Sequence, residues 1–331
     1  MLASDMKEKQ YMLDVQNLTV EYNMSRNRKT RAVSSVEFQI REGETLGLVG
    51  ESGCGKSTAA LAIMRLINPV AGKILFDGHD LLSLDKKSLK KLRPLFQMIL
   101  QDSVSSLNPR RKIGETIAAP LKEFEEKDSA ERKKLAVKIM EAVGVDPEKI
   151  DLLPFRFSGG ECQRIQIARA LITKPKLLIA DEPVSSLDVS IQAQILNLLK
   201  DMKRRFGLTM LFISHDLAVI KNICDRVAVM YLGKICEIAD SEDLYDSPAH
   251  PYTAALLKAV PRFDSVKNTF EPAASLRVKP SPPSLFDSPE GCRFRMRCPE
   301  AVDICARKEP LLNRIAPSRY AACHARCPHN M

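Results

Sequence analysis

Apolar runs alternate with helical repeats of apolar positions along most of the chain. Runs rich in Leu, Ile and Val predict strands at residues 13–20, 45–50, 177–181 and 208–214. Apolar side chains also recur every three or four residues from Ile191 to Phe206 and stop at Gly207, which predicts a helix that ends at a glycine. Strands that alternate with helices are typical of an α/β domain with a mostly parallel sheet.

The same pattern divides the chain into parts. Residues 1–10 are polar and predict a flexible tail, and residues 11–260 carry the α/β pattern. Within that domain, residues 102–175 are rich in helical signals and predict a helical insertion. Proline and serine crowd residues 261–289, which predicts an irregular linker ahead of a small C-terminal module that ends at residue 331.

Composition supports a globular, cytoplasmic protein. The chain has 331 residues, of which 45% are hydrophobic and 27% charged, and these are ordinary values for folded domains. It contains neither an apolar run long enough to span a bilayer nor an N-terminal export signal. The net charge of +9 favours an anionic partner, and residues 259–331 hold +5 of it, with 12 Lys and Arg against 7 Asp and Glu.

A glycine-rich stretch directly after the predicted strand at 45–50 matches the phosphate-loop pattern G-x-x-x-x-G-K-[ST]. Glycines allow backbone N–H groups to wrap around phosphates, the lysine meets the outer phosphate oxygens, and the following hydroxyl is a ligand for Mg²⁺. A helical pattern follows at residues 59–66, as this motif requires. The residues that we expect to bind nucleotide here are Gly50, Ser52, Gly53, Cys54, Gly55, Lys56, Ser57 and Thr58.

Two carboxylates end the apolar strand at residues 177–181. Asp181 is placed to hold Mg²⁺, and Glu182 is placed to orient or deprotonate an attacking water. An acidic pair at a strand end is common, but its position downstream of a phosphate loop favours this catalytic interpretation.

The order of further motifs resembles that of ATP-binding cassette (ABC) ATPases. Tyr22 matches the aromatic residue that stacks on adenine, and Gln101 matches the glutamine loop. The signature-like stretch follows and consists of Ser158, Gly159, Gly160 and Glu161. After it, Asp188 matches the loop that follows the acidic strand, and His215 matches the switch histidine. The resemblance implies a P-loop NTPase fold of the ABC type, with a RecA-like core, a β subdomain and a helical insertion.

The resemblance also implies a divided site. Two cassettes bind ATP between them, and the signature residues of one chain face the phosphate loop of the other. Within one chain, Ser57, Gln101 and Asp181 would contact Mg²⁺, Glu182 and His215 would serve catalysis, and ATP hydrolysis would release the pair.

Glu161 departs from the family pattern, which usually has glutamine at this position. An ionised carboxylate near polyphosphate is unfavourable. We therefore expect slower turnover than in a Glu161→Gln variant.

Three stretches resemble the ATPase subunits of oligopeptide, dipeptide and nickel permeases, in particular the second of their two paired ATPases. These stretches are residues 106–110, 181–194 and 250–257, although Ser103 stands where that group usually has proline. The resemblance implies import of oligopeptides or dipeptides, with nickel or another solute as an alternative. It further implies two transmembrane permease subunits, a related ATPase or a second copy of this chain, and an extracytoplasmic binding protein. The chain would then lie on the cytoplasmic face of the membrane as a peripheral subunit.

The C-terminal cysteines resemble a module of the same permease ATPases. Segments this short rarely fold without a metal or disulfides. Disulfides are typical of exported proteins and are not expected in this chain, because its sequence shows no export signal. The resemblance favours a [4Fe–4S] cluster on Cys292, Cys298, Cys305 and Cys323. Zn²⁺ and metal-free thiols are the alternatives, and the tail is remote in sequence from the ATP chemistry.

A soluble ABC ATPase that acts on nucleic acid or ribosomes is the competing hypothesis, with the basic tail as its binding module. Such proteins usually carry two cassettes in one chain, whereas this chain has one phosphate loop and one signature. The importer is therefore favoured, and no nucleic acid partner is expected.

Overall fold

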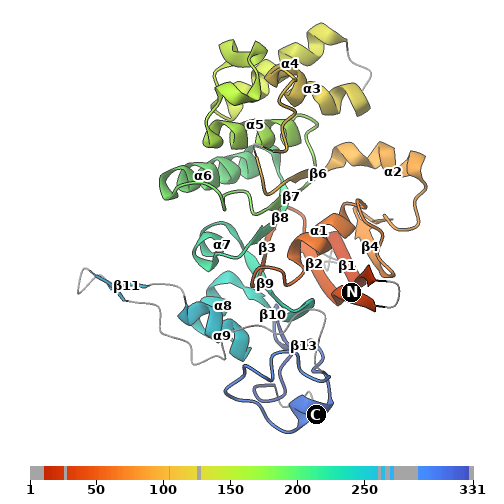
Figure 1. Ribbon diagram of the computed structural model, residues 1–331, viewed down its shortest axis with the longest axis vertical. Coiled ribbons are helices and arrows are strands. Elements are labelled where there is room, and N and C mark those ends of the chain that lie inside the picture. The colour runs from red at the N-terminus through yellow and green to blue at the C-terminus, as the bar shows by residue number, and fades with distance from the viewer. Residues whose placement is uncertain are drawn as a thin grey trace, which may run out of the picture.

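A computed structural model describes residues 11–25, 28–103, 105–124, 128–259, 262–264, 269–271 and 290–327. Its centre is an eight-stranded sheet (Figure 1). Five neighbouring strands are parallel, as predicted, and the remaining three extend the sheet in antiparallel fashion. The strand order is β13 (Asn313–Ala316), β14 (Arg319–Ala321), β10 (Lys234–Asp240), β9 (Arg226–Tyr231), β3 (Thr45–Val49), β8 (Thr209–Ser214), β7 (Leu177–Asp181) and β6 (Phe96–Ile99).

A second, antiparallel sheet packs on the first through α1 (Lys56–Ile63). The first predicted strand, at 13–20, lies here and not in the parallel sheet. This sheet shares one apolar core with α1, the helix that follows the phosphate loop, and so fixes the position of that helix. The strands are β2 (Arg28–Arg41), β1 (Tyr11–Ser25), β4 (Ala71–Phe76) and β5 (His79–Asp80). A separate hairpin pairs β11 (Arg262–Asp264) with β12 (Thr269–Glu271).

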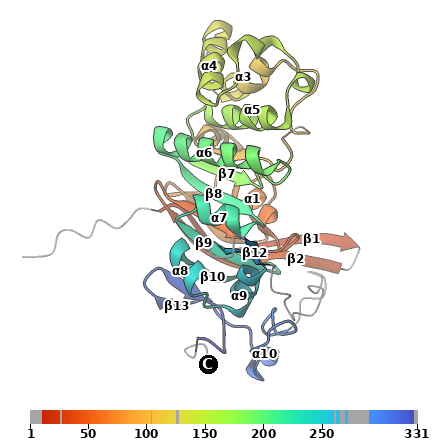
Figure 2. The same ribbon diagram turned by 90° about the vertical axis from the view of Figure 1, so that its left-hand side faces the viewer.

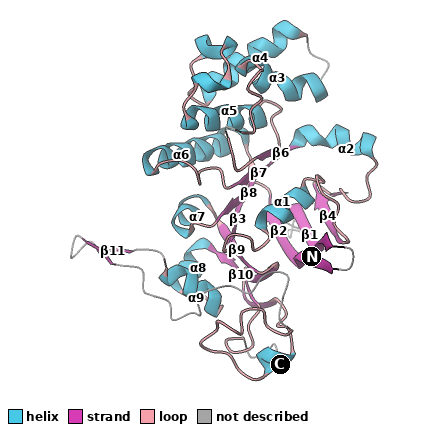
Figure 3. Cartoon of the chain, in the orientation of Figure 1, coloured by secondary structure: helices cyan, strands magenta, loops and turns pink. Residues whose placement is uncertain are grey.

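The predicted helical insertion is a bundle at one end of the molecule (Figure 3). It contains α3 (Ile113–Phe124), α4 (Ser129–Ala142) and α5 (Gly159–Leu171), with short 3₁₀ turns at Pro147–Asp151 and Pro154–Arg156. The other helices cover the sheets or join their strands. They are α2 (Lys86–Leu92), α6 (Val189–Phe206), α7 (Leu217–Ile223), α8 (Ser241–Asp246), α9 (Pro251–Lys258) and α10 (Ile304–Arg307), with a 3₁₀ turn at Arg93–Leu95.

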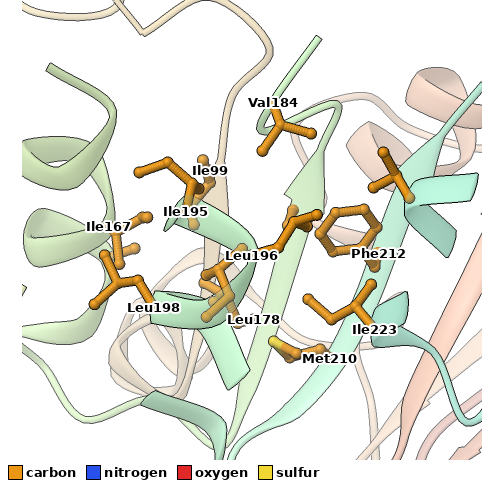
Figure 4. Packing of buried hydrophobic residues seen from close by; sticks show 14 of the residues in the cluster. Ile99, Ile167, Leu178, Val184, Ile195, Leu196, Leu198, Met210, Phe212 and Ile223 are labelled. Carbon is orange, nitrogen blue, oxygen red and sulfur yellow. The ribbon is translucent and has the colours of Figure 1, made fainter. Parts of the chain in front are cut away.

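Helix α6 begins and ends where its sequence indicates. Asp188 accepts a hydrogen bond from the backbone N–H of Ile191 at the start, and Gly207 adopts a left-handed conformation at the end. The apolar face of α6 packs between α5 and the strands β7 and β8: Leu196 lies beside Leu178 of β7, and Leu198 lies beside Ile167 of α5 (Figure 4). This packing fixes the position of α6 against the parallel strands whose carboxyl ends carry the predicted site residues.

The C-terminal module, residues 290–327, lies at the end of the molecule opposite the helical bundle (Figure 2). Its strand β14 pairs with β10, with Ala321 opposite Glu237, and so continues the central sheet. The predicted tail at 1–10 and most of the predicted linker at 261–289 lie outside the described residues. Among the helices that the structure describes, none is both long and apolar enough to cross a bilayer.

Candidate nucleotide site

The phosphate loop connects β3 to α1 and is tightly enclosed at two glycines. A Cβ at Gly50 would overlap the carbonyl oxygen of Met230 on β9. Gly55 has a φ of +110°, and a Cβ there would overlap the carbonyl oxygen of Ala32 on β2. Both sheets therefore determine the shape of the loop, and glycine is required at these two positions.

Lys56, the lysine of the loop, is 4% exposed and points back into it. Its Nζ donates hydrogen bonds to the carbonyl oxygens of Gly50, at 2.7 Å, and Glu51, at 3.0 Å. The ammonium group thus lies inside the curve of the loop, where its charge can be shared with an incoming phosphate.

Ser57 and Asp181 meet across the site, although they are far apart in sequence. The Ser57 hydroxyl donates to a carboxylate oxygen of Asp181 at 3.0 Å. Burial raises the pKa of Asp181, while the Ser57 hydrogen bond lowers it. A hydroxyl and a carboxylate in contact are the kind of oxygen ligands that Mg²⁺ uses beside nucleotide phosphates.

Glu182 joins two further predicted residues. Nε2 of Gln101, after β6, donates to one carboxylate oxygen of Glu182 at 3.0 Å. Nδ1 of His215, after β8, lies 3.0 Å from the other oxygen. Glu182 has a φ of +45°, an unfavourable conformation for a residue with a Cβ. Because parallel strands end at one edge of the sheet, three separate loops bring these side chains together.

Tyr22 lies on β1 with 39% of its surface exposed. It pairs with Thr30 on β2, two residues before Ala32, whose carbonyl borders Gly55. An exposed aromatic ring on the strand pair beside the loop is available for stacking, and the predicted contact with adenine stays a prediction.

The signature residues begin α5 within the helical bundle. Ser158 and Glu161 form a reciprocal capping box: the Ser158 hydroxyl accepts from the Glu161 N–H, and the Glu161 carboxylate accepts from the Ser158 N–H. Glu161 also accepts from Nζ of Lys149 at 2.9 Å, and this bond lowers its pKa. The carboxylate that we expected to repel phosphate is therefore paired with a cation.

Gly160 packs closely on the segment that follows the acidic strand. A Cβ at Gly160 would crowd the side chain of Ile191, at 2.8 Å, and the neighbouring Gly159 faces Leu187. Asp188 lies in the same segment and is committed to capping α6. The signature and the predicted dimer loop thus form one continuous surface.

The sequence matches two family models. Residues 33–185 match the model described as ABC transporter, and residues 236–305 match the model described as oligopeptide/dipeptide transporter, C-terminal region. A Brucella ovis protein named as a peptide import ATP-binding protein is 47% identical, over 94% of this chain and 97% of that protein. The oligopeptide transport ATP-binding protein AppF of Bacillus subtilis is 47% identical, over 89% of each chain.

The chain belongs to the ABC transporter family. A solved dimer of the ATP-binding cassette MJ0796, bound to ADP and Pi, has the same fold, with a TM-score of 0.64 and 28% identity over 70% of this chain and 99% of that one. As an ABC ATPase, the chain hydrolyses ATP, and ATP with Mg²⁺ is its expected ligand pair.

The metal prediction for the C-terminal module is not supported. All nine cysteines lie in the described residues and none forms a disulfide. Within the described part of the chain, no group of three or more His, Cys, Asp or Glu side chains could hold a metal ion.

Sequence reasoning missed three residues that touch the ATPase motifs. Lys149 pairs with Glu161, and Tyr252 and Arg297 both bind Glu51 of the phosphate loop. The tail is remote from the loop in sequence but adjacent in space. A glutamate inside the phosphate loop was the available signal, because a carboxylate there requires a cationic partner.

Proposed function

We propose that this chain is the ATP-hydrolysing subunit that powers import of oligopeptides or dipeptides. The observation that carries the proposal is the convergence of Gln101, Glu182 and His215 beside the Ser57–Asp181 pair. The oligopeptide/dipeptide C-terminal region and the names of relatives such as AppF support the choice of cargo.

In this proposal each motif residue has a defined task. Loop N–H groups and Lys56 would bind the phosphates, and Ser57 with Asp181 would hold Mg²⁺, whose charge would offset that of the phosphate oxygens. Glu182 accepts a proton from the attacking water. Gln101 and His215 each contact one oxygen of the Glu182 carboxylate and so hold the group from two sides.

The site needs a second cassette. The signature N–H groups at the start of α5 favour an anion, but they lie in the helical bundle (Figure 1) and would serve the phosphate loop of a partner. The dimeric MJ0796 structure supports this arrangement. The partner is a related ATPase or a second copy, joined by two membrane subunits and, in the full complex, an extracytoplasmic binding protein. The chain would lie at the cytoplasmic face of the membrane.

Co-purification in mild detergent from the native cells, with every bound protein identified, tests this function. Two membrane subunits with a second cassette are the expected result, and ATP hydrolysis in vesicles should rise with peptide-loaded binding protein. Stimulation by a nickel chelate but by no peptide would overturn the peptide cargo. Ribosomes or DNA-bound proteins without membrane subunits would overturn transport.

We further propose that four cysteines of the module bind a [4Fe–4S] cluster. Burial raises the pKa of Cys292 to about 11, and the thiols of Cys305, Cys298 and Cys323 act in the same direction. A cluster holds each thiolate on a different iron, which requires wider spacing than one Zn²⁺ ion does.

Anaerobic purification with assays for iron, sulfide and zinc tests the cluster. We expect iron and sulfide in equal amounts, lost in Cys298→Ser and retained in the control Cys327→Ser. Absence of iron and sulfide from the anaerobic parent would overturn it.

A further inference from the structure

Arg297 belongs to the C-terminal module, but its guanidinium lies against the phosphate loop. Nη2 donates to one carboxylate oxygen of Glu51 at 2.8 Å, and Nη1 donates to the other at 2.9 Å. The Arg297 side chain is only 12% exposed. Two parallel charge-assisted bonds shielded from water form one of the strongest polar contacts available to a protein.

Glu51 is held from a second direction. Its backbone N–H donates to the hydroxyl of Tyr252 at 3.1 Å. The Tyr252 ring packs on Tyr231 and Phe294, at centroid distances of 4.5 and 5.3 Å, and Arg297 lies over both of these rings. Both the backbone and the side chain of Glu51 are therefore fixed by residues outside the loop.

A second arginine of the module approaches the other half of the loop. Arg293 donates to the carbonyl oxygen of Leu232 and, at 3.0 Å, to the hydroxyl of Ser34. The next residue, Gly233, donates its N–H to the carbonyl oxygen of Cys54 at 2.8 Å. The module thus supports the loop at Glu51 directly and at Cys54 through one turn.

The charge of Glu51 gives this contact a second effect. The carboxylate sits one residue after Gly50, in a loop that receives polyphosphate, where an uncompensated negative charge would repel the ligand. Arg297 supplies the compensating charge at hydrogen-bonding distance.

We propose that Arg297 is a positioning residue for ATP binding: through Glu51 it fixes the shape of the phosphate loop and cancels the loop's negative charge. The C-terminal module thereby sets the affinity of the chain for ATP. This inference rests on ATP being the ligand of the loop.

The test is calorimetric titration of Mg²⁺-ATP into the full chain, in a Glu182→Gln background so that ATP is not consumed. Arg297→Gln should raise the dissociation constant about tenfold, as expected when a ligand-positioning group is lost. Arg297→Lys restores the charge without the two parallel bonds and should recover part of this loss. In the hydrolysing chain, Arg297→Gln should raise KM for ATP more than it lowers kcat.

Arg326→Gln is the matched control. Arg326 makes a similar two-pronged contact with Glu300 in the same module, away from the loop. Its loss should leave ATP affinity unchanged, even if both variants unfold at a lower temperature than the parent.

A double-mutant cycle separates positioning from general stability. In a Glu51→Gln chain, Arg297→Gln should change ATP affinity by less than about twofold, because the charge to be cancelled is gone. Unchanged ATP affinity in Arg297→Gln, or equal effects in the two backgrounds, would overturn the inference. A parent chain that binds no ATP would overturn the proposed function and this inference with it.

Discussion

His215 and Glu182, which are 33 positions apart, lie with Nδ1 and a carboxylate oxygen 3.0 Å from each other at the ends of neighbouring parallel strands. The Glu182 side chain is 11% exposed and the His215 side chain 53% exposed. The carboxylate is therefore enclosed, while about half of the histidine side chain stays accessible to solvent or ligand.

Replacing Glu182 by glutamine should abolish hydrolysis without abolishing binding. The amide keeps the size of the side chain but cannot accept the proton of the attacking water, a role worth about 10²- to 10⁴-fold in rate. Phosphate release measures hydrolysis, and calorimetric titration measures ATP affinity. Glu141→Gln, on the exposed surface of α4, is the control. Hydrolysis at the parent rate in Glu182→Gln would place the base elsewhere.

Two glycines of the phosphate loop should respond differently to alanine. A Cβ at Gly50 would overlap the backbone of Met230, so Gly50→Ala must displace the loop and should remove ATP binding. Gly53 has open space around it and a φ of +77°, so Gly53→Ala should cost about 1 kcal/mol of strain. Thermal unfolding and ATP titration of both variants would show this contrast. Equal loss of binding in both would contradict the role of Met230.

Lys149 should affect the rate of ATP hydrolysis only while residue 161 carries a negative charge. Lys149→Gln leaves the Glu161 carboxylate unpaired at the surface that would face the partner's nucleotide in the proposed dimer, and hydrolysis should fall about threefold, the size expected for a partly exposed pair. Glu161→Gln keeps the capping box and should raise turnover, as the sequence predicts. Lys149→Gln should then have no effect in the Glu161→Gln chain. Lys133→Gln, which loses a pair with Asp151 in the same helical bundle, is the control.

The stability of the folded chain should decrease as the pH is lowered, because of His250. Burial lowers its pKa to about 4, while the unfolded chain titrates near 6.5. The unfolded state therefore binds more protons between these values, so stability is full above pH 6.5 and falls as the pH decreases toward 4.

Urea unfolding at pH 7.5 and pH 5.5 measures this dependence. The His250 contribution to the difference should be about 1 kcal/mol. Asn at this position can still accept the Tyr252 N–H, so His250→Asn should reduce the difference by that amount. An identical pH dependence in both chains would assign it to other groups.

Local motifs explain why much of the fold and the site could be predicted. The phosphate loop is contiguous, and the hydrophobic periodicity of α6, with Asp188 before it and Gly207 after it, specifies both ends of that helix. Gln101, Glu182 and His215 are separate in sequence, and their meeting follows from parallel strands that end at one edge. The order of the strands and motifs in the sequence was therefore enough to predict that these three side chains meet.

The contacts of the tail could not be predicted in this way. Arg297 and Glu51 are 246 positions apart, and nothing in the alternating run of three arginines between Cys292 and Cys298 indicates which of them pairs with Glu51. The pairing of β14 with β10 is also hidden, because a three-residue strand is too short to show alternation. The close spacing of the C-terminal cysteines in the sequence indicated that they belong to one module, but it did not indicate that this module packs on the nucleotide domain.

The strands of the tail also cover an edge of the central sheet that would otherwise be open. Without β14, the strand β10 would offer a row of open backbone groups, flanked by the apolar side chains of Ile235 and Ile238, as a template for another chain. With the tail in place, the outermost strand is β13, which has four residues and carries Arg314. We therefore expect a chain shortened after residue 259 to lose its contacts at the phosphate loop and also to become less soluble. The exposed edge of β10 could then pair with the same edge of another chain.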